Sequence, residues 1–446
     1  PYTTLFRSHA IAVLSLDCPL GTFASFGAEH APAIRPERSV RDLFGLIPIG
    51  APDERPWLDH GRWDLSAPMG KRGAPRTDRA YAFLPVEGES LHQIPVGPVH
   101  AGIIEPGHFR FTANGDTIVR LEARLGYTHK GVEHLMAGAD IARAAQIAGR
   151  VSGDSTVAYA WAFARAAEAA LDVEAPQRAQ YLRALMAELE RLANHFGDVG
   201  AICNDAAFVL MHAHCGILRE RVLRAADACF GHRLMRDCIV PGGVERDIAP
   251  AGAATLARQI RDWRKRFANL ADLYDETNSL EDRTVGAGIL APPLAKRFAA
   301  GGYVGRASGR KFDVRQALAY PPYNALMFSV PVLERGDVDA RVRIRMLEIE
   351  QSLRLIEQIL DALPAGEVSL PLPAASGEGM ALIEGFRGDI LAWLRIDDQR
   401  RIARCHLRDP SWFQWPLLEA AIEGNIVGDF PLCNKSFNCS YSGCDL

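Results

Sequence analysis

Apolar residues recur with the spacing of one helical face through the middle of the chain. Leu182, Leu185, Leu189 and Leu192 lie three or four residues apart, after Pro176, a residue favoured in the first turn of a helix. Comparable patterns predict further helices over residues 139–170, 206–230, 250–279 and 341–363. Elements of this length and apolar content favour a bundle of long helices packed side by side.

Shorter segments with extended character lie on either side of this helical region. Residues 93–99, 107–112 and 117–125 read as strands, and Asn114-Gly115-Asp116 between the last two is a strong hairpin-turn signal. Residues 377–408 also alternate apolar and polar positions around a second turn. We therefore predict an α+β, predominantly helical fold: a long-helix bundle flanked by small antiparallel sheets.

The first 85 residues follow a different pattern and predict a partial α+β unit. Residues 1–8 read like the translation of a common sequencing adapter and are set aside, the alternative being an ordinary N-terminal strand. Residues 11–16 are apolar enough for a buried strand, and a short helix is expected to end at Gly45. Residues 72–89 read as a linker, so we predict units over residues 9–85 and 86–446.

Composition and charge exclude several classes of function. With 446 residues, 48% hydrophobic, 23% charged and a net charge of −4, the chain offers no bulk electrostatic case for nucleic acid. No apolar run reaches the length of a membrane span. The nine cysteines include no C-x-x-C pair, which argues against a disulfide framework and for a reducing compartment. No dinucleotide-binding glycine loop and no P-loop occurs, so direct NADH binding is unsupported.

The segment Arg150-Val151-Ser152-Gly153-Asp154-Ser155 carries the most specific chemistry. It resembles the arginine-x-cysteine-glycine-x-cysteine segment that begins the metal site in large subunits of nickel–iron hydrogenases. The spacing is kept, but Ser152 and Ser155 replace both cysteines. A serine hydroxyl is a poor substitute for thiolate, the soft ligand that selects such metals. The resemblance therefore implies a hydrogenase frame in which a nickel–iron site is not expected.

The second ligand pair of hydrogenases lies near the C-terminus, where this chain carries Cys433, Cys439 and Cys444. The gaps between these cysteines are too wide for the hydrogenase pattern. Two interpretations stay open: a different metal bound by the three thiols, with Cys433 and Cys439 as the candidate ligands, or a packed tail without a metal.

A longer series of matches resembles the large subunit of respiratory complex I, the NADH-quinone oxidoreductase. It runs through residues 305–315, 320–323, 336–337 and 341–352, and places Arg345 and Glu348 as inward charges of a bundle helix. Residues 37–57 resemble the end of the smaller complex I subunit that precedes the large one. A truncated small-subunit-like domain fused to a large subunit is the order of the membrane-bound, formate hydrogenlyase-type branch.

The same resemblance suggests roles for individual residues. His100 and His108 match the Gly-Pro-x-His segment and the histidine loop that lines the quinone pocket of complex I, although loop histidines bonded to backbone are the plain alternative. Glu133 takes the position of the proton-passing glutamate of hydrogenases, against the alternative of an exposed helix residue. Arg150 stands where complex I carries a quinone-binding tyrosine. It is expected to bond a ligand or Asp154, or to form a structural salt bridge.

Together these residues predict a subunit of a membrane-associated, NADH-quinone oxidoreductase- or hydrogenase-like complex. It would shape a quinone-type redox cavity, with an iron–sulfur cluster on a one-cluster partner subunit and with antiporter-like membrane subunits. It would lie on the cytoplasmic, inner face of the cell membrane and be held there by these partners. Two alternatives are a structural coupling subunit without a redox ligand and a hydrogenase with atypical metal ligands.

Overall fold

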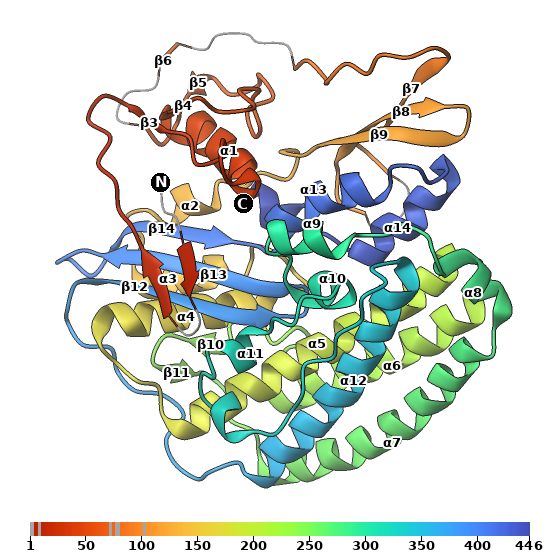
Figure 1. The fold of residues 1–446 in the computed structure, drawn as a ribbon. Coiled ribbons are helices and arrows are strands. Elements are labelled where there is room, and N and C mark those ends of the chain that lie inside the picture. Colours follow the sequence, from red (N-terminus) through yellow and green to blue (C-terminus); the bar gives the residue numbers. More distant parts are fainter. Residues whose placement is uncertain (1–3, 8–9, 71–73, 76–80, 101–103) are drawn as a thin grey trace.

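Four long helices lie side by side and form the bundle that the sequence predicts (Figure 1). They are α5 (Gln177–Asp205), α6 (Val209–Phe230), α7 (Pro250–Asp275) and α12 (Val338–Asp361). The computed structural model describes residues 4–7, 10–70, 74–75, 81–100 and 104–446. The four leucines that predicted α5 are all fully buried, as is Phe196 on the same helix, so its apolar face is the centre of the bundle.

The predicted helix over residues 139–170 is two helices, α3 (Ile141–Ala148) and α4 (Thr156–Leu171), separated by the turn that carries Ser152 and Ser155. Asp140 caps α3 by accepting a hydrogen bond from the backbone N–H of Arg143. The shorter helices are α2 (Val132–Met136), α8 (Asn278–Thr284), α9 (Pro292–Arg297), α10 (Gly302–Ala307), α11 (Val314–Ala317), α13 (Ser411–Ala421), α14 (Phe430–Phe437) and α15 (Ser442–Asp445).

The predicted C-terminal sheet is confirmed as β12 (Gly377–Gly385), β13 (Gly388–Ile396) and β14 (Ile402–Arg408), all antiparallel. Helix α4 packs on it so closely that a Cβ on Gly377 or Gly379 would lie 2.0 or 2.1 Å from a carbonyl oxygen of α4. Most of β12 and β13 is buried, so the sheet is an internal layer between helices and not a half-exposed face.

A second antiparallel sheet contains β7 (Leu91–Val96), β8 (His108–Asn114) and β9 (Thr117–Arg124). The predicted hairpin turn is confirmed, since Asn114 pairs with Thr117 and Gly115 has a φ of 57°, in the left-handed region. Phe109 and Phe111 of β8 pack edge-on against Phe430, which attaches this sheet to α14.

The N-terminal part contains α1 (Ile34–Phe44), which ends at Gly45 as predicted, and the parallel pair β3 (Thr22–Ala24) and β4 (Ile47–Ile49). It packs on the rest of the chain through the Arg35–Glu419 ion pair (2.6 Å) and the Trp57–Trp412 ring contact. Residues of both proposed units share one continuous apolar core, and the boundary at 85/86 stays a prediction. The minor pairs are β5 (Leu65–Ser66) with β6 (Ala74–Pro75) and β10 (Ile239–Val240) with β11 (Gly243–Val244).

The strand expected within residues 11–16 is present as β2 (Ala10–Val13), which pairs with β1 (Thr4–Arg7), but it is not the buried strand that was predicted. Ile11 and Val13 are only partly buried, and Leu14 and Leu16 beyond the strand are 56% and 53% exposed. An apolar run indicates a strand but does not by itself show whether another layer covers it. Residues 1–3 and 8 of the adapter-like segment, and 72–73 and 76–80 of the expected linker, lie outside the described residues.

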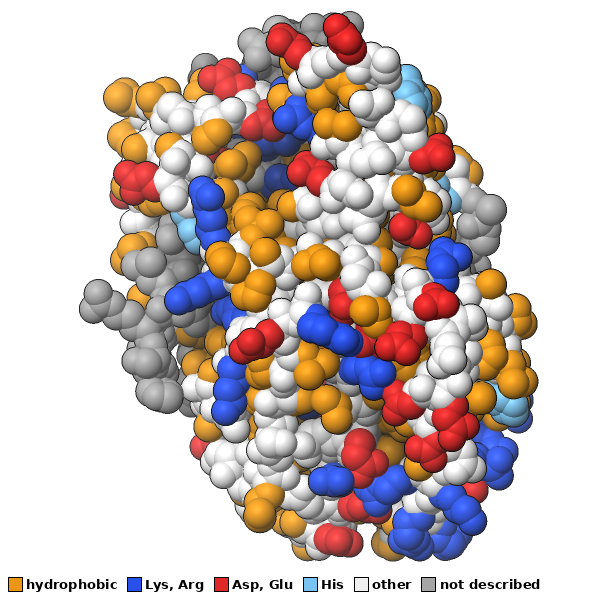
Figure 2. Space-filling model, turned by 45° about the vertical axis from the view of Figure 1, so that its right-hand side comes forward, with side chains coloured by type: hydrophobic (Ala, Val, Ile, Leu, Met, Phe, Trp, Pro, Cys, Tyr) orange, Lys and Arg blue, Asp and Glu red, His pale blue; other side chains and the backbone are white. Residues whose placement is uncertain are grey.

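Figure 2 shows Lys and Arg side chains interspersed with Asp and Glu over one face of the molecule. Within the described part of the chain, no helix combines the length and apolar character that a membrane span requires.

Candidate functional site

The turn between α3 and α4 directs its polar side chains onto one carboxylate. Ser152 Oγ donates a hydrogen bond to Asp154 Oδ1 at 2.6 Å, and Ser155 Oγ donates to the same oxygen at 3.3 Å. Both serines are buried, with 6% and 2% of their surface exposed. The two positions that resemble ligand cysteines therefore hold hydroxyl groups that are already engaged by Asp154.

Asp154 forms its ion pair with Arg387, at 2.5 and 2.9 Å. Arg387 is buried in the hairpin between β12 and β13 and also approaches Ser155 Oγ at 3.4 Å. Burial alone would raise the pKa of Asp154, but the Arg387 guanidinium and the two serine hydroxyls hold that pKa below its usual value. The centre of the turn is thus a charged pair at neutral pH.

The C-terminal segment closes the other side of this pair. Arg387 Nε donates to the carbonyl of Asn438, and Ser440 Oγ donates to Ser152 Oγ at 3.5 Å. Asn438 Nδ2 donates to Asp198 Oδ1 at 2.9 Å. A third serine, Ser440, therefore faces the turn from the tail, and the candidate site is lined by hydroxyls from two distant segments.

The three tail cysteines are buried, and burial raises the pKa of each thiol, that of Cys433 to about 11. Cys433 lies against Gly288 and Arg341, whereas Cys439 and Cys444 lie on the side of Asp409. No group of three or more His, Cys, Asp or Glu side chains in the described ranges is placed to hold a metal ion. The geometry of the candidate ligands Cys433 and Cys439 is that of packed, protonated thiols.

Arg150 does not reach Asp154. Its guanidinium donates to both carboxylate oxygens of Asp237 at 2.6 and 2.7 Å, and both side chains are 40% exposed. Of the expected alternatives, the structure shows the surface salt bridge. The ion-pair partner of Asp154 is instead Arg387, which lies 233 residues away in sequence.

Glu133 is buried on α2, and its Oε1 accepts a hydrogen bond from Nδ1 of His406 on β14 at 2.7 Å. Its neighbour Lys130 makes the contact with the site turn, because Nζ donates to the carbonyl of Val151 at 2.6 Å. The same segment is held by the chain end, since the Lys130 N–H donates to the Leu446 carbonyl. Glu133 is thus not an exposed helix residue. Its segment contacts the serine turn through the hydrogen bond from Lys130 to Val151.

His100 and His108 lie at the two ends of the connection between β7 and β8, of which residues 101–103 are outside the described residues. His100 Nε2 bonds the Gly107 carbonyl at 2.8 Å. His108 Nδ1 bonds the Gly97 carbonyl at 3.3 Å, and Arg110 Nε donates to His108 Nε2 at 3.4 Å. Burial lowers the pKa of His108, so the ring is neutral at pH 7.

The histidine connection reaches the turn through the tail. Glu105 accepts a hydrogen bond from the backbone N–H of Ser442 at 3.1 Å. Gly107 lies so close to Tyr441 that a Cβ there would be 2.6 Å from the ring. The connection that carries the histidines and the Ser152–Asp154 turn therefore both contact the same C-terminal segment, through Glu105 and Gly107 on the one hand and Ser152 on the other.

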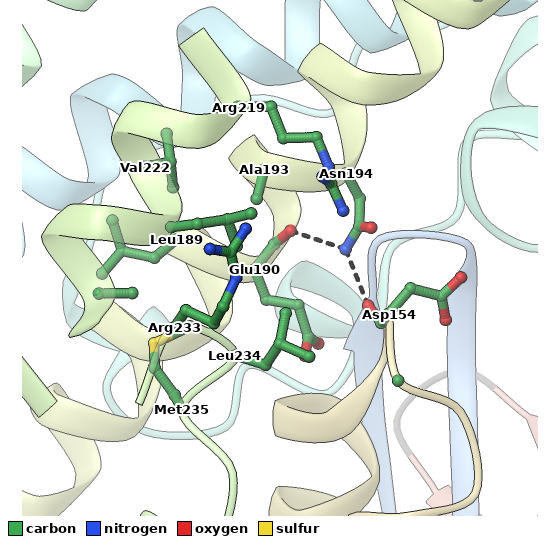
Figure 3. A pocket seen from close by; sticks show the side chains of 13 residues that line it. Asp154, Leu189, Glu190, Ala193, Asn194, Arg219, Val222, Arg233, Leu234 and Met235 are labelled. Carbon is green, nitrogen blue, oxygen red and sulfur yellow. Dashed lines mark hydrogen bonds between the residues drawn. The ribbon is translucent and has the colours of Figure 1, made fainter. Parts of the chain in front are cut away.

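A cavity of about 150 Å³ lies on the bundle side of the turn, between α5 and α6 (Figure 3). Asn194 Nδ2 donates to the backbone carbonyls of Asp154 and Glu190, while the Asp154 carboxylate points away from the cavity. Glu190 caps α4 by accepting hydrogen bonds from the N–H groups of Val157 and Ala158, and burial raises its pKa to about 8. The cavity is bounded by apolar side chains and by Arg219 and Arg233.

Arg387, Asn438, Ser440 and Asp198 were not identified from the sequence. A signal existed only for Arg387, which lies in a short Gly385-Phe386-Arg387-Gly388 turn between two apolar strands. A charged residue at the tip of a buried hairpin needs a partner, but the sequence does not say which one.

Comparisons with known proteins match nearly the whole chain. The family model described as "Respiratory-chain NADH dehydrogenase, 49 Kd subunit" matches residues 198–374 and 369–446. The model "Nickel-dependent hydrogenase" matches residues 130–197, which include the serine turn.

Two relatives illustrate the two kinds of complex to which similar chains belong. "Formate hydrogenlyase subunit 5" of Escherichia coli is 32% identical over 93% of this chain and 75% of its own length. An "NADH-quinone oxidoreductase" subunit of Roseiflexus is 32% identical over 76% of this chain and 94% of its own length.

Among solved structures, a chain of the "membrane-bound sulfane sulfur reductase (MBS), an archaeal respiratory membrane complex" superimposes with a TM-score of 0.75 at 26% identity. The match covers 81% of this chain and all of that one. The similar proteins are thus subunits of membrane-bound hydrogenase and respiratory oxidoreductase complexes.

Proposed function

The chain belongs to the family of the respiratory-chain NADH dehydrogenase 49 kDa subunit, and on this premise we propose that it is the large subunit of a membrane-bound oxidoreductase complex. In this proposal it shapes a redox-coupled cavity for a quinone-type acceptor and carries no working nickel–iron site. Electrons arrive from an iron–sulfur cluster on a partner subunit, and membrane subunits anchor the complex at the inner face of the membrane.

The observation that carries the proposal is the Asp154–Arg387 ion pair and the serines around it. Ser152 and Ser155 of the turn donate to Asp154, and Ser440 of the tail donates to Ser152, so hydroxyls stand where thiolate ligands are expected. Hydroxyls are protonated near neutral pH and do not replace the thiolates that a nickel–iron group requires. The residues present therefore do not fit that group.

The proposed acceptor site lies between the histidine connection and the tail. His108 presents a neutral imidazole that donates from Nδ1, and its bond to the Gly97 carbonyl is long at 3.3 Å. A quinone oxygen that replaces this carbonyl would gain a donor without moving a charge. The Roseiflexus relative is named as part of an NADH-quinone oxidoreductase, and this name supports a quinone as the class of acceptor.

Binding of a quinone analogue to the purified complex tests this assignment. His108→Ala is expected to weaken binding about tenfold, because one hydrogen bond to the head group is lost. His92→Ala is the matched control, since His92 is an exposed histidine on β7 of the same sheet and is expected to leave binding unchanged. Equal affinity of wild type and His108→Ala would contradict the site.

One observation favours a second candidate, a structural subunit that couples its partners without a redox ligand. Asp154, Arg387 and both histidines all have hydrogen-bond partners within the chain, so none of these four side chains requires a ligand to satisfy it. Absence of any saturable quinone-analogue binding to the intact complex would support this second function over the first.

A further inference from the structure

Eight charged or titratable side chains meet in the centre of the bundle, where each is at most 3% exposed. We name them the Arg306 cluster. Its members are Glu188, Arg191 and His195 of α5, Arg306 of α10, Asp313 and Arg315 at α11, Glu348 of α12 and Glu384 of β12. None of them contacts the serine turn directly, and the proposed function does not use them.

Three carboxyl groups converge on one guanidinium at the centre of the cluster. Arg306 lies 2.7 Å from Glu348, 2.9 Å from Glu384 and 3.6 Å from Asp313, and its side chain is fully buried. Like charges this close disfavour one another's ionisation when no water screens them. One guanidinium cannot neutralise three carboxylates, so the other cations of the cluster decide the balance.

The remaining cations are already shared with further acids. Arg315 pairs with Asp313 at 2.7 Å and with Glu188 at 2.8 Å, and Arg191 lies 3.4 Å from Glu188 and 3.8 Å from Glu348. Four carboxyl groups thus face three guanidinium groups. A buried excess charge is costly and is commonly removed by binding a proton.

One further cation, Arg310, lies near the cluster without a hydrogen bond to its acids. It is half-buried, and its Nη1 donates to the Ala300 carbonyl at 2.7 Å. Its charge interacts first with Asp389 and then with Glu384, so it offsets the excess negative charge of the cluster only in part.

His195 is not the site of this proton. Its Nε2 bonds Glu348 Oε2 at 2.8 Å, while its Nδ1 is buried without a hydrogen-bond partner among the described residues. A protonated ring would bury an N–H at Nδ1 with no acceptor. Burial accordingly lowers the pKa of His195, although Glu348 acts in the opposite direction.

Glu384 is the least compensated acid of the cluster. Its carboxyl accepts from one nitrogen of Arg306 and from the Val314 N–H at 3.0 Å. Glu188, in contrast, accepts from Arg315, from the Tyr323 hydroxyl and from Ser352. Burial, followed by the charge of Asp313, raises the pKa of Glu384 to about 7, whereas the pKa values of Glu188, Asp313 and Glu348 are lowered.

We propose that the Arg306 cluster is a proton-binding site that holds one exchangeable proton on the Glu384 carboxyl, directly behind the hairpin that presents Arg387 to Asp154. The proton comes from water and returns to water, and only the O–H bond of Glu384 forms or breaks. The role in a redox cavity rests on the proposed function, whereas the proton itself does not.

A short covalent and hydrogen-bonded path joins the two sites. Arg191 donates to the carbonyls of Glu384 and Gly385 at 2.8 and 3.0 Å, and Arg387 follows two residues later. A change of charge on Glu384 therefore acts on the hairpin that fixes the Arg387 guanidinium. The proton affinity of the Glu384 carboxyl would therefore respond to a change of charge at the serine turn.

Infrared spectroscopy of the purified complex, containing the full chain, tests the proposal. The carbonyl stretch of a protonated, buried carboxyl group is expected to disappear as the pH rises from about 5 to about 9, with a midpoint near neutrality. Glu190, whose pKa is raised to about 8, contributes a second buried carboxyl band, so the spectra are compared in a Glu190→Gln background. There the titrating band is expected to be absent after Glu384→Gln and retained after Glu350→Gln, a matched control because Glu350 is a partly exposed acid on α12. Absence of a titrating band in the Glu190→Gln protein, or its persistence after Glu384→Gln is added, would overturn the assignment.

A second variant keeps the proposal testable if Glu384→Gln does not fold. Asp313→Asn removes the nearest competing carboxylate, so the midpoint of the Glu384 band is expected to fall by about one pH unit or more. An unchanged midpoint would contradict the charge count. If the wild-type complex shows the titrating band but no quinone-analogue binding, only the proposed function is refuted. If it binds the quinone analogue but shows no titrating band, only the proton site is refuted.

Discussion

The serine turn and the Arg306 cluster lie on the two sides of one hairpin, and they differ in how they balance charge. At the turn, one carboxylate meets one guanidinium and two hydroxyls, and the Asp154 side chain keeps 35% of its surface exposed. In the cluster, four carboxyl groups share three guanidinium groups away from water. The balanced pair stays ionised, whereas the unbalanced cluster has a reason to bind a proton.

Removal of the central cation should have the largest effect. Arg306→Met leaves Glu348, Glu384 and Asp313 without their shared guanidinium, and we expect the free energy of unfolding to fall by about 5 kcal/mol or the protein not to fold. Thermal unfolding measures the loss. Arg354→Met, on the exposed side of the same bundle, is expected to change stability by less than about 1 kcal/mol. A small effect of Arg306→Met would mean that the cluster is not tightly coupled.

The balanced pair should be less sensitive to the loss of its cation. Arg387→Met is expected to cost about 2–3 kcal/mol, since Asp154 keeps part of its contact with water. The double variant Asp154→Asn/Arg387→Met should recover part of that cost, because it removes the charge left unpaired. Denaturant unfolding of the single and double variants measures the coupling. Strictly additive losses would contradict the pairing.

Glu384 of the cluster and Asp154 of the turn should respond to pH with opposite signs. The pKa of Glu384 is raised from 4.5 to about 7, so its contribution favours the folded state below pH 4.5 and is lost as the pH rises through about 7. The pKa of Asp154 is lowered, so its contribution is present above its ordinary pKa and is lost on acidification.

Glu384→Gln should therefore flatten the decline in stability between about pH 5 and 7, by about 3 kcal/mol at most. Unfolding midpoints measured across this range provide the check. A variant that keeps the wild-type slope would show that another group titrates there.

The smallest effect should come from Arg150. Its pair with Asp237 is 40% exposed on both sides, so Arg150→Ala is expected to cost less than about 1 kcal/mol. Quinone-analogue binding should also stay unchanged in Arg150→Ala. Arg387→Met, which breaks the ion pair at the serine turn, is expected to change it. A severe loss of quinone-analogue binding in Arg150→Ala would show that Arg150 is part of the binding site.

The sequence predicted the fold better than the site because the two rest on different information. Helical spacing identified α5 and α12. The resemblance to the complex I large subunit placed Arg345 and Glu348 inward, where they are 0% and 1% exposed. The hairpin at Gly115 followed from local turn chemistry. For Arg150 the sequence left a ligand, Asp154 and a structural salt bridge open; the structure pairs it with Asp237, and the partner of Asp154 is Arg387. Pairing between distant segments depends on tertiary packing, which no local pattern encodes.

The nickel content of the purified complex tests the central claim most directly, because the account assigns the place of a metal to the Asp154–Arg387 pair and three serines. We expect no stoichiometric nickel and no hydrogen uptake. One nickel per chain, together with hydrogen uptake, would contradict the account.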